Sequence, residues 1–414
     1  MLKRISFMMV LLLMAAVPAA SETNIDGFLQ GLYGARLDEA NPTATEYSAS
    51  ETRLQMRLQH FGDVSEFFGR MDFTYDAADT ADYRWELREG FLKFRLGGNF
   101  DFKVGRQVLT WGTGDLVFIN DVFAKDYRSF FSGRDDQYLK APQTALRMEY
   151  YNRLGSFSFV WTPRFEPNRL PTGRKFSYYF PLENRIVGEG YFFEPPTPEA
   201  KFENGEFASR FSRQVGNFNT SLYFYKGFYK NPLGFDPNAM SAVYPRLNVY
   251  GASTRGTLLG GILWLEGGYF DSRDDRDGDD ANTPNSSMNG LLGFERQVAA
   301  NLTANIQWQA DYMLDYDTFA SQQRPGVFIR DETRHLLTSR ITKLLNSELI
   351  TLSAFVFYSP SDGDAYVRLS ASYRYTDEVT LAAGGNIFTG RHDNTEFGQF
   401  QKNDNVYLKM TYGF

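Results

Sequence analysis

Charged side chains recur at every second position in several early segments of the chain, and they are the residues best suited to act on a solute. Residues two apart share one face of an extended strand. An arginine-rich face that borders water attracts anions and repels cations. The residues in this phase are Arg53, Arg57, Arg70, Asp72, Arg84, Glu86, Arg88, Lys103, Arg147 and Glu149.

Two interpretations of this charged face remain open at this stage. Basic residues outnumber acidic ones on it, although the whole chain carries a formal net charge of -7. The face could therefore line a water-filled lumen and favour anions. It could equally be a ladder in which arginine and carboxylate side chains pair across neighbouring strands. The alternation breaks near Glu89 and Gly90, where we expect a β-bulge.

A long acidic and aromatic stretch, residues 110–142, follows the fifth predicted strand. We predict that it folds inward as a constriction loop, with the aromatic residues as anchors and the acidic ones facing the basic wall. The alternative is a solvated external loop. The constriction residues we expect are Asp115, Asp121, Asp126, Tyr127 and Arg128, with Asp135 and Asp136 as further acids.

A second long stretch, residues 164–204, is rich in aromatic residues and proline. A loop of this length and composition usually packs on something. It could cap a pore, bind an apolar or sugar ligand, dock a partner, or simply pack against neighbouring loops. Of these, packing against neighbouring loops is the default expectation.

Metal and catalytic chemistry have weak support. Six aspartates between Asp271 and Asp280 resemble a Ca²⁺ loop in composition, but Arg273 stands where an early ligand belongs, so we expect a solvated tip that bridges lipopolysaccharide through divalent ions. The three histidines have no serine in a recognisable catalytic motif nearby. We therefore predict no enzyme activity, no metal site and no cofactor.

The elements that carry these residues read as short strands. Runs of about ten residues alternate in polarity and are separated by turn residues, as in transmembrane barrels. Collecting such runs predicts an all-β fold, an antiparallel barrel of about eighteen transmembrane strands. The predicted strands lie near 26–36, 52–61, 66–76, 83–94, 100–109, 143–152, 155–163, 205–214, 218–228, 245–256, 261–271, 287–297, 302–313, 332–343, 348–358, 364–375, 378–388 and 403–414.

The connections between these strands alternate in length, which favours a barrel over a soluble sandwich. Tight turns alternate with long stretches such as 110–142, 164–204 and 389–402. Outer-membrane barrels have short periplasmic turns and long external loops. Closing the sheet pairs every backbone group in lipid, and a barrel this wide leaves an aqueous lumen unless loops fill it.

The two ends of the chain indicate export to the outer membrane of a Gram-negative bacterium. Residues 1–20 have the basic start, apolar core and small-residue site of a signal peptide, so the barrel domain is 21–414. The last nine residues alternate strictly, with large apolar residues at every second position up to Phe414. We expect Tyr412 and Phe414 to act as an assembly signal for the barrel assembly machinery. The chain has no cysteine and no basic tract of the nucleic-acid-binding kind.

Three pieces in order carry a family resemblance: ELREGFL at 86–92, VGRQVLTWG at 104–112 and DVFAKDYR at 121–128. They resemble the REAYL, GRQxxxWG and DxxNPxDYR pattern of uncharacterised proteobacterial outer-membrane barrels, loosely related to alginate-export-type porins. The match covers about residues 84–151. It departs at Gly90, where alanine is usual, and at Ala124-Lys125, where Asn-Pro is common. The resemblance implies an outer-membrane channel without a known substrate.

The sequence therefore favours a porin-like channel for passive diffusion of small hydrophilic, anionic solutes. One alternative is a barrel sheath around a periplasmic multihaem cytochrome in an electron conduit. Another is an exporter of an apolar or polymeric ligand that uses loop 164–204. The expected surroundings are outer-membrane lipid and lipopolysaccharide, and assembly into a homo-oligomer is left open.

Overall fold

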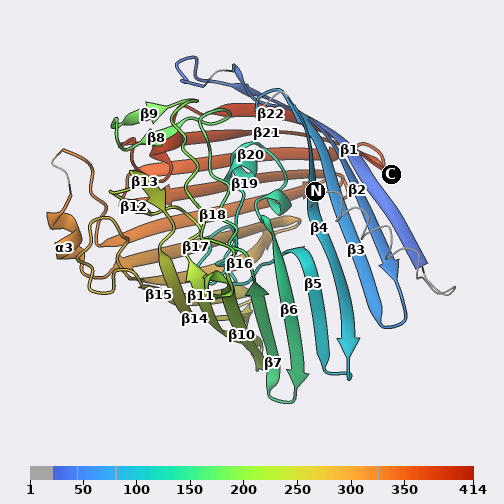
Figure 1. The fold of residues 1–414 in the computed structure, drawn as a ribbon. Helices are drawn as coiled ribbons and strands as arrows, with labels where there is room; N and C mark the ends of the chain where they lie inside the picture. Colours follow the sequence, from blue (N-terminus) through green and yellow to red (C-terminus); the bar gives the residue numbers. More distant parts are fainter. Residues whose placement is uncertain (1–21, 44, 80–81, 324–325) are drawn as a thin grey trace.

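Eighteen antiparallel strands, joined in chain order, form the wall of the computed structural model, which describes residues 22–43, 45–79, 82–323 and 326–414 (Figure 1). Strand β1 pairs with β2 on one side and with β22 on the other, so the sheet closes on itself. Closure leaves no strand edge, so no row of backbone N–H and C=O groups is left unpaired in lipid. The predicted fold class and strand number are confirmed, while the predicted signal peptide falls outside the described residues.

Each predicted strand corresponds in order to one strand of the wall, with ends that differ by a few residues. The wall strands are β1 (Glu22–Arg36), β2 (Tyr47–Phe61), β3 (Ser65–Asp76), β4 (Tyr83–Leu96), β5 (Phe100–Val108), β6 (Pro142–Asn152), β7 (Gly155–Thr162), β10 (Glu206–Val215), β11 (Phe218–Phe228), β14 (Arg246–Leu258), β15 (Gly261–Ser272), β16 (Ser287–Ala299), β17 (Leu302–Met313), β18 (Thr333–Leu345), β19 (Ile350–Ser359), β20 (Asp364–Arg374), β21 (Val379–Gly390) and β22 (Asn405–Gly413).

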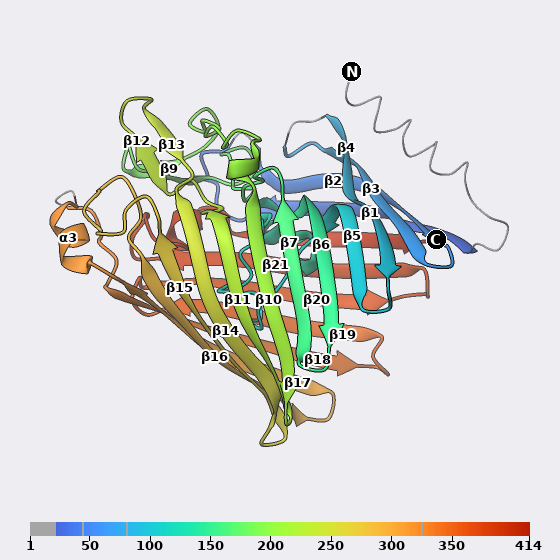
Figure 2. The ribbon, with the colours of Figure 1, turned by 60° about the horizontal axis from the view of Figure 1, so that its bottom comes forward.

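The connections alternate in length, as the sequence predicts. Turns of two to four residues join the strands at one end, and the connections at the other end are longer except for the four-residue connection 360–363 between β19 and β20. The loops contain two hairpins that the sequence did not indicate, β8–β9 (Tyr178–Phe180, Arg185–Val187) and β12–β13 (Gly234–Asp236, Ser241–Val243), and the helix α3 (Tyr316–Ser321). Figures 1 and 2 both show these pieces at the end opposite the C terminus. A one-turn 3₁₀ helix, η2 (Phe202–Asn204), follows β8–β9 in the same loop, and another, η3 (Gly398–Phe400), lies in the loop before β22.

The outer face of the wall is apolar. On β22 the large residues Val406, Leu408, Met410, Tyr412 and Phe414 are all exposed, whereas Asn405 in the opposite phase is fully buried inside. This is the alternation that a lipid-facing strand requires. Among the described residues, no helix has the length and apolar character needed to cross a membrane.

The seam between β1 and β22 depends on a glycine. The backbone groups of Gly27 and Phe414 exchange two hydrogen bonds of 2.9 and 3.0 Å. A Cβ at residue 27 would lie 2.9 Å from the Phe414 ring and closer still to the Gln55 carbonyl. A side chain there would therefore displace the terminal aromatic residue that we propose as part of the assembly signal.

The strand phase is interrupted at Arg88 rather than at Gly90. Opposite β3, Arg70 pairs with Glu89 and Met71 pairs with Leu87, so Arg88 is the extra residue of a bulge. A bulge places two successive side chains on one face. Both Arg88 and Glu89 consequently point inward, and the charged phase continues on either side of them.

Candidate functional site

The loop of residues 109–141, between β5 and β6, folds into the barrel and crosses its lumen. It contains the short helix α2 (Tyr127–Phe131) and the 3₁₀ turn η1 (Asp136–Tyr138). Its side chains and backbone contact the inner wall on β2, β15, β17, β18, β20 and β22. The loop therefore narrows the lumen from several sides at once, which is the arrangement of a constriction.

Two phenylalanines at the end of α2 anchor the loop in an aromatic cluster. The Phe130 ring lies 5.9 Å from Phe357 on β19 and 5.6 Å from Tyr366 on β20, both edge to face. Phe131 lies 4.6 Å from Phe400 and 5.4 Å from Phe388. Aromatic pairs at such spacings add about 0.5–1.5 kcal/mol each beyond burial. The cluster fills the interior beside β18–β21.

Three loop carboxylates pair with basic residues on the late strands. Asp115 lies 2.9 Å from Arg340 on β18, and Asp136 lies 2.8 Å from Arg368 on β20. Asp135 pairs with Lys409 on β22. The acidic loop thus meets a basic wall, but on β18–β22 rather than on the second to sixth strands. These carboxylates close the loop against that wall, and no open gap separates the two charges there.

The pairing of Asp136 makes the loop sensitive to acid. Burial alone would raise the pKa of Asp136, but Arg368 and Arg340 outweigh burial and hold the pKa below its ordinary value. A carboxyl group whose folded pKa is lowered stabilises the folded loop above its unfolded pKa of about 3.9 and loses this contribution as the pH falls through the folded pKa.

We therefore expect channel conductance to stay constant from neutral pH down to about pH 4 and to become larger or noisier below it. Asp136→Asn should show the acid behaviour already at neutral pH, because the amide cannot pair with two guanidinium groups as an anion. Single-channel recording across the pH range measures this, with Asp274→Asn as a control in an external loop. A neutral-pH record of Asp136→Asn identical to the unsubstituted protein would contradict the expectation.

Glu266 on β15 holds the first part of the loop. Its carboxylate accepts hydrogen bonds from the Thr113 N–H at 2.6 Å and the Asn120 N–H at 2.7 Å, and from both side chains. Gln307 on β17 donates to the Asp115 carbonyl and accepts from the Asp115 N–H, each at 2.8 Å. Both wall residues are almost fully buried. Glu266 and Gln307 thus bind the loop backbone directly, so this part of the loop is held in place independently of most of its side chains.

Arg53 on β2 and Asp72 on β3, both predicted to line the lumen, face inward but are buried, whereas Arg57 nearer the short-turn end of β2 is about half-exposed. Arg53 is buried between Glu51 and Asp72, and Glu51 also receives Arg134 from the loop. The Tyr138 ring lies between the guanidinium groups of Arg53 and Arg88, at 4.2 and 4.4 Å. These residues hold the loop against the wall, because the chain folds back over them.

Most of the other predicted wall residues pair with a residue of opposite charge, but only Arg57 and Arg70 do so across neighbouring strands as in the ladder interpretation. The pairs are Arg57 with Asp26, Arg70 with Glu89, Arg84 with Asp79, Arg147 with Glu149, and Glu86 with Arg169. Asp72 forms an ion pair with Arg53, and Arg88 donates hydrogen bonds to the carbonyls of Gln137 and Lys140. Their charges are thus largely balanced locally.

A different set of inward cations has no carboxylate within ion-pair distance in the described part of the chain. Lys103 lies 3.6 Å above the Phe91 ring, Arg210 on β10 lies 5.6 Å from Trp111, and Arg255 on β14 lies 5.0 Å from Trp264. Arg255 also donates to the Thr113 carbonyl of the loop. Only Lys103 was among the sequence-predicted residues. Following the inward phase into the predicted strands 205–214 and 245–256 would have found the other two.

The predicted constriction residues divide into two groups. Asp115 touches the wall, as described above. Two others hold the loop together: Asp121 pairs with the buried Lys125, and the Asp126 carboxylate caps α2 by accepting the Ser129 N–H. Arg128 joins the loop to loop 164–204 by donating to the Leu170 carbonyl. Tyr127 packs against the first aromatic cluster.

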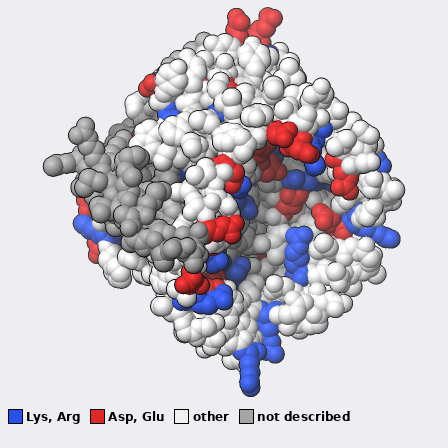
Figure 3. Space-filling view, turned by 90° about the vertical axis from the view of Figure 1, so that its right-hand side faces the viewer, with Lys and Arg blue, Asp and Glu red and all other residues white. Residues whose placement is uncertain are grey.

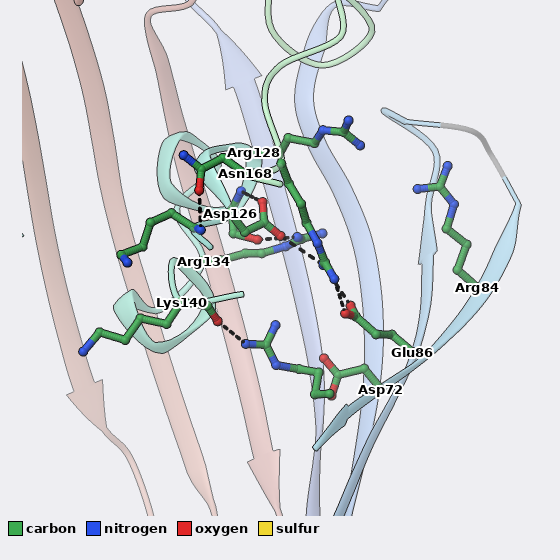
Figure 4. A network of polar contacts seen from close by, with 12 residues as sticks. Asp72, Arg84, Glu86, Asp126, Arg128, Arg134, Lys140 and Asn168 are labelled. Carbon is green, nitrogen blue, oxygen red and sulfur yellow. Dashed lines mark hydrogen bonds and ion pairs between the residues drawn. The ribbon is translucent and has the colours of Figure 1, made fainter. Parts of the chain in front are cut away.

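The long loop 164–204 crosses the mouth at the loop end and reaches the opposite wall. Lys175 pairs with Asp76 on β3, and the side-chain amide of Asn403 bonds to both Ser177 N–H and Ser177 C=O. Residues 168–170 run alongside 125–128 of the constriction loop (Figure 4). The loop therefore packs on its neighbours and on the wall, and it covers part of the lumen.

Several carboxylates of the aspartate-rich tip, residues 271–280, pair with arginines or accept backbone N–H groups close by. Asp271 pairs with Arg276, Asp274 pairs with Arg246, and Asp275 accepts the N–H groups of Asp279 and Asp280. Within residues 22–43, 45–79, 82–323 and 326–414, no group of three or more acidic, histidine or cysteine residues has metal-binding geometry.

Charged side chains also surround the opening at the other end. Figure 3 views the end that carries the C terminus and shows a hollow bordered by both basic and acidic side chains. A second buried cluster, which includes Trp111, Tyr223 and Val249, fills the interior beside β6–β14 towards the loop end. The lumen is therefore open at the short-turn end and crowded at the loop end.

Comparisons with solved structures establish the fold. OccAB3 of Acinetobacter baumannii superposes with a TM-score of 0.57 over 95% of this chain and 99% of that chain, at 10% identity. OccD3 (OpdP) of Pseudomonas aeruginosa superposes with a TM-score of 0.55 over 95% of this chain and 91% of that one, at 11% identity. No protein-family model matches the chain, and no curated protein matches it by sequence.

The chain thus has the porin-like barrel fold of the bacterial outer membrane, in agreement with the predicted location. The resemblance to alginate-export-type barrels correctly implied a barrel, whereas no family match supports the specific motif pattern. At this level of identity the neighbours inform the architecture and carry no residue roles.

Proposed function

We propose that the protein is a channel for passive diffusion of small hydrophilic anions across the outer membrane. The single observation that carries the proposal is the set of inward cations without carboxylate partners: Lys103, Arg210 and Arg255. An uncompensated cation beside water attracts anions and lowers the barrier to their passage.

The positions of these cations support this selectivity. Lys103 on β5 is followed by Arg210 on β10 and Arg255 on β14, so the uncompensated cations extend along one side of the barrel. Arg147, opposite Lys103 on β6, is paired with Glu149. Arg255 touches the constriction loop at Thr113. A solute that passes the loop would therefore meet these cations. Arg53 and Arg88, which the sequence suggested for this role, are buried and committed to holding the loop.

Liposome swelling with matched anionic and neutral solutes tests the proposal. Replacing all three cations together, as Lys103→Gln, Arg210→Gln and Arg255→Gln, should slow swelling in the anionic solute about tenfold while leaving the neutral solute nearly unaffected. Arg213→Gln, an exposed position on the outer face of β10, is the matched control. Equal swelling in the two solutes for the unsubstituted protein would overturn the anion preference.

The two alternatives have less support. A sheath around a cytochrome needs a wide bore with its loops outside, and loop 109–141 occupies that space. An exporter that binds its ligand on loop 164–204 could use the exposed Phe193 and Phe202, but Phe176 of that loop is buried in the aromatic cluster and Lys175 and Ser177 tie the loop to Asp76 and Asn403. We therefore retain the diffusion channel.

A further inference from the structure

At the level of the constriction loop, most sides of the lumen are filled. The aromatic cluster occupies the side of β18–β21, and the second cluster occupies the side of β6–β14. Beside β15 and β17, Glu266 and Gln307 are buried beneath the loop, and beside β2 and β3 so are Glu51 and Arg53. On these sides the polar groups that stay open at the loop are the part-exposed carboxylates of Asp135 and Asp136 and the Arg255 side chain on β14.

The side along β4 is polar and partly open as well. Glu86 pairs in register with Asp72, whose carboxylate accepts from Gln55, and Gln55 also reaches Tyr138 of the loop, so Glu86 lies at the level of the constriction. The side chains of Glu86 and Arg169 are each about one-third exposed, at 33% and 32%. Arg84, next to them on the same face of β4, is half-exposed.

One ion pair spans this open side. Arg169, from loop 164–204, donates from both terminal nitrogens to both oxygens of Glu86, one of them at 3.2 Å, and contacts Asp126 at 3.4 Å. Figure 4 shows Glu86 and Arg84 on the β4 side facing Asp126 and Arg128 on the loop side. The Arg169 side chain therefore bridges the polar space between β4 and the constriction loop. We call this space the strip, and a solute would pass through it.

The backbone beneath Arg169 is fixed, so only its side chain is free to move. The Arg169 N–H donates to the Lys125 carbonyl at 2.8 Å, and its carbonyl accepts the Tyr127 N–H at 3.0 Å. The Asn168 side chain also accepts the Lys125 N–H. A rearrangement at this bridge can therefore be confined to the Arg169 side chain, with both loop backbones in place.

Resting on the proposed anion channel, we propose that the Arg169–Glu86 pair is a gate in which the Glu86 carboxylate stands in for the anionic group of the solute. An arriving carboxylate-type anion competes for the Arg169 fork, Glu86 is released, and the strip beside β4 opens. Arginine matches a two-oxygen anion with two parallel hydrogen bonds, which a single-atom anion cannot make. Arg128 lacks a carboxylate within ion-pair distance among the described residues and adds attraction beside the gate.

Single-channel conductance of two variants separates a gate from a simple charged wall. If the pair blocks the strip, both Arg169→Gln and Glu86→Gln raise the conductance about twofold or more, because either change breaks the bridge. If Arg169 only attracts anions, Arg169→Gln lowers the conductance while Glu86→Gln raises it. A fall or no change for Arg169→Gln, or no change for Glu86→Gln, overturns the gate.

Arg174→Gln is the matched control, since Arg174 lies in the same loop and pairs with Glu189 on the exposed surface. It should conduct like the unsubstituted protein. Replacing chloride by acetate at constant ionic strength tests the competition: the open fraction should rise in the unsubstituted protein and stay unchanged in Glu86→Gln. An open fraction independent of acetate overturns the exchange.

The outcome is separable from that of the proposed function. The direction of the conductance change in the two variants can be read whether or not the channel prefers anions. If the channel showed no preference for chloride but both variants had higher conductance, the anion proposal would be contradicted and the gate proposal would be supported. If the unsubstituted protein and both variants showed no measurable conductance, the gate proposal would be wrong, because breaking the Arg169–Glu86 pair would not open a path.

Discussion

Excision of residues 127–137 from the constriction loop, replaced by a short glycine-serine linker, should raise single-channel conductance several-fold. The excised piece contains the Phe130 and Phe131 anchors and the Asp135 and Asp136 pairs that hold the loop across the lumen. An eighteen-stranded barrel is too wide for wall side chains to fill, so removing the loop should leave a broad aqueous bore.

Planar-bilayer recording measures this effect, and retained resistance to unfolding on unheated gels shows that the barrel still closes. The matched control removes the β12–β13 hairpin, residues 234–243, which lies at the loop end outside the constriction (Figure 1). That deletion should leave conductance close to the starting value. An unchanged conductance after excision of 127–137 would show that the loop does not limit flow.

Replacing Glu266 by alanine should produce the largest loss of stability among single wall substitutions. Two backbone N–H groups of the loop, at Thr113 and Asn120, would lose their acceptor, and Asn120 is buried. Unsatisfied buried donors cost about 1–3 kcal/mol each, so a total loss of about 3–5 kcal/mol is expected. Conductance should rise as well, because the first part of the loop is released.

Urea unfolding followed by tryptophan fluorescence measures the loss, since Trp111 and Trp264 lie beside this contact. Glu295→Ala is the control: Glu295 shares the inward phase on β16, and no side-chain partner of it is found in the described residues. It should fall within about 0.5 kcal/mol of the unsubstituted protein. Equal stabilities for the two variants would refute the role of Glu266 as the holding residue.

The barrel itself could be predicted because lipid imposes a regular pattern on the chain. Every second residue of a spanning strand faces lipid, and every short turn returns the chain to the same side. Both regularities are local, so the strands near 302–313 and 403–414 could be found without knowing their partners. The hairpins β8–β9 and β12–β13 escaped prediction because their three-residue strands are too short to show a period.

The site was only partly predictable because charge pairing is a long-range property. Phase placed Arg53 and Arg88 inside, but their burial follows from Tyr138, which arrives from a loop fifty or more residues away. The partners of the acidic loop, Arg340, Arg368 and Lys409, come from strands more than two hundred residues later. No spacing rule within the sequence connects such positions.

The reversal potential of the purified barrel under a potassium chloride gradient tests the central claim most directly. The account predicts steady open channels with a preference for chloride, and loss of that preference when Lys103, Arg210 and Arg255 are replaced together by glutamine. A preference for potassium in the unsubstituted protein would contradict it, because the uncompensated cations would then not control passage.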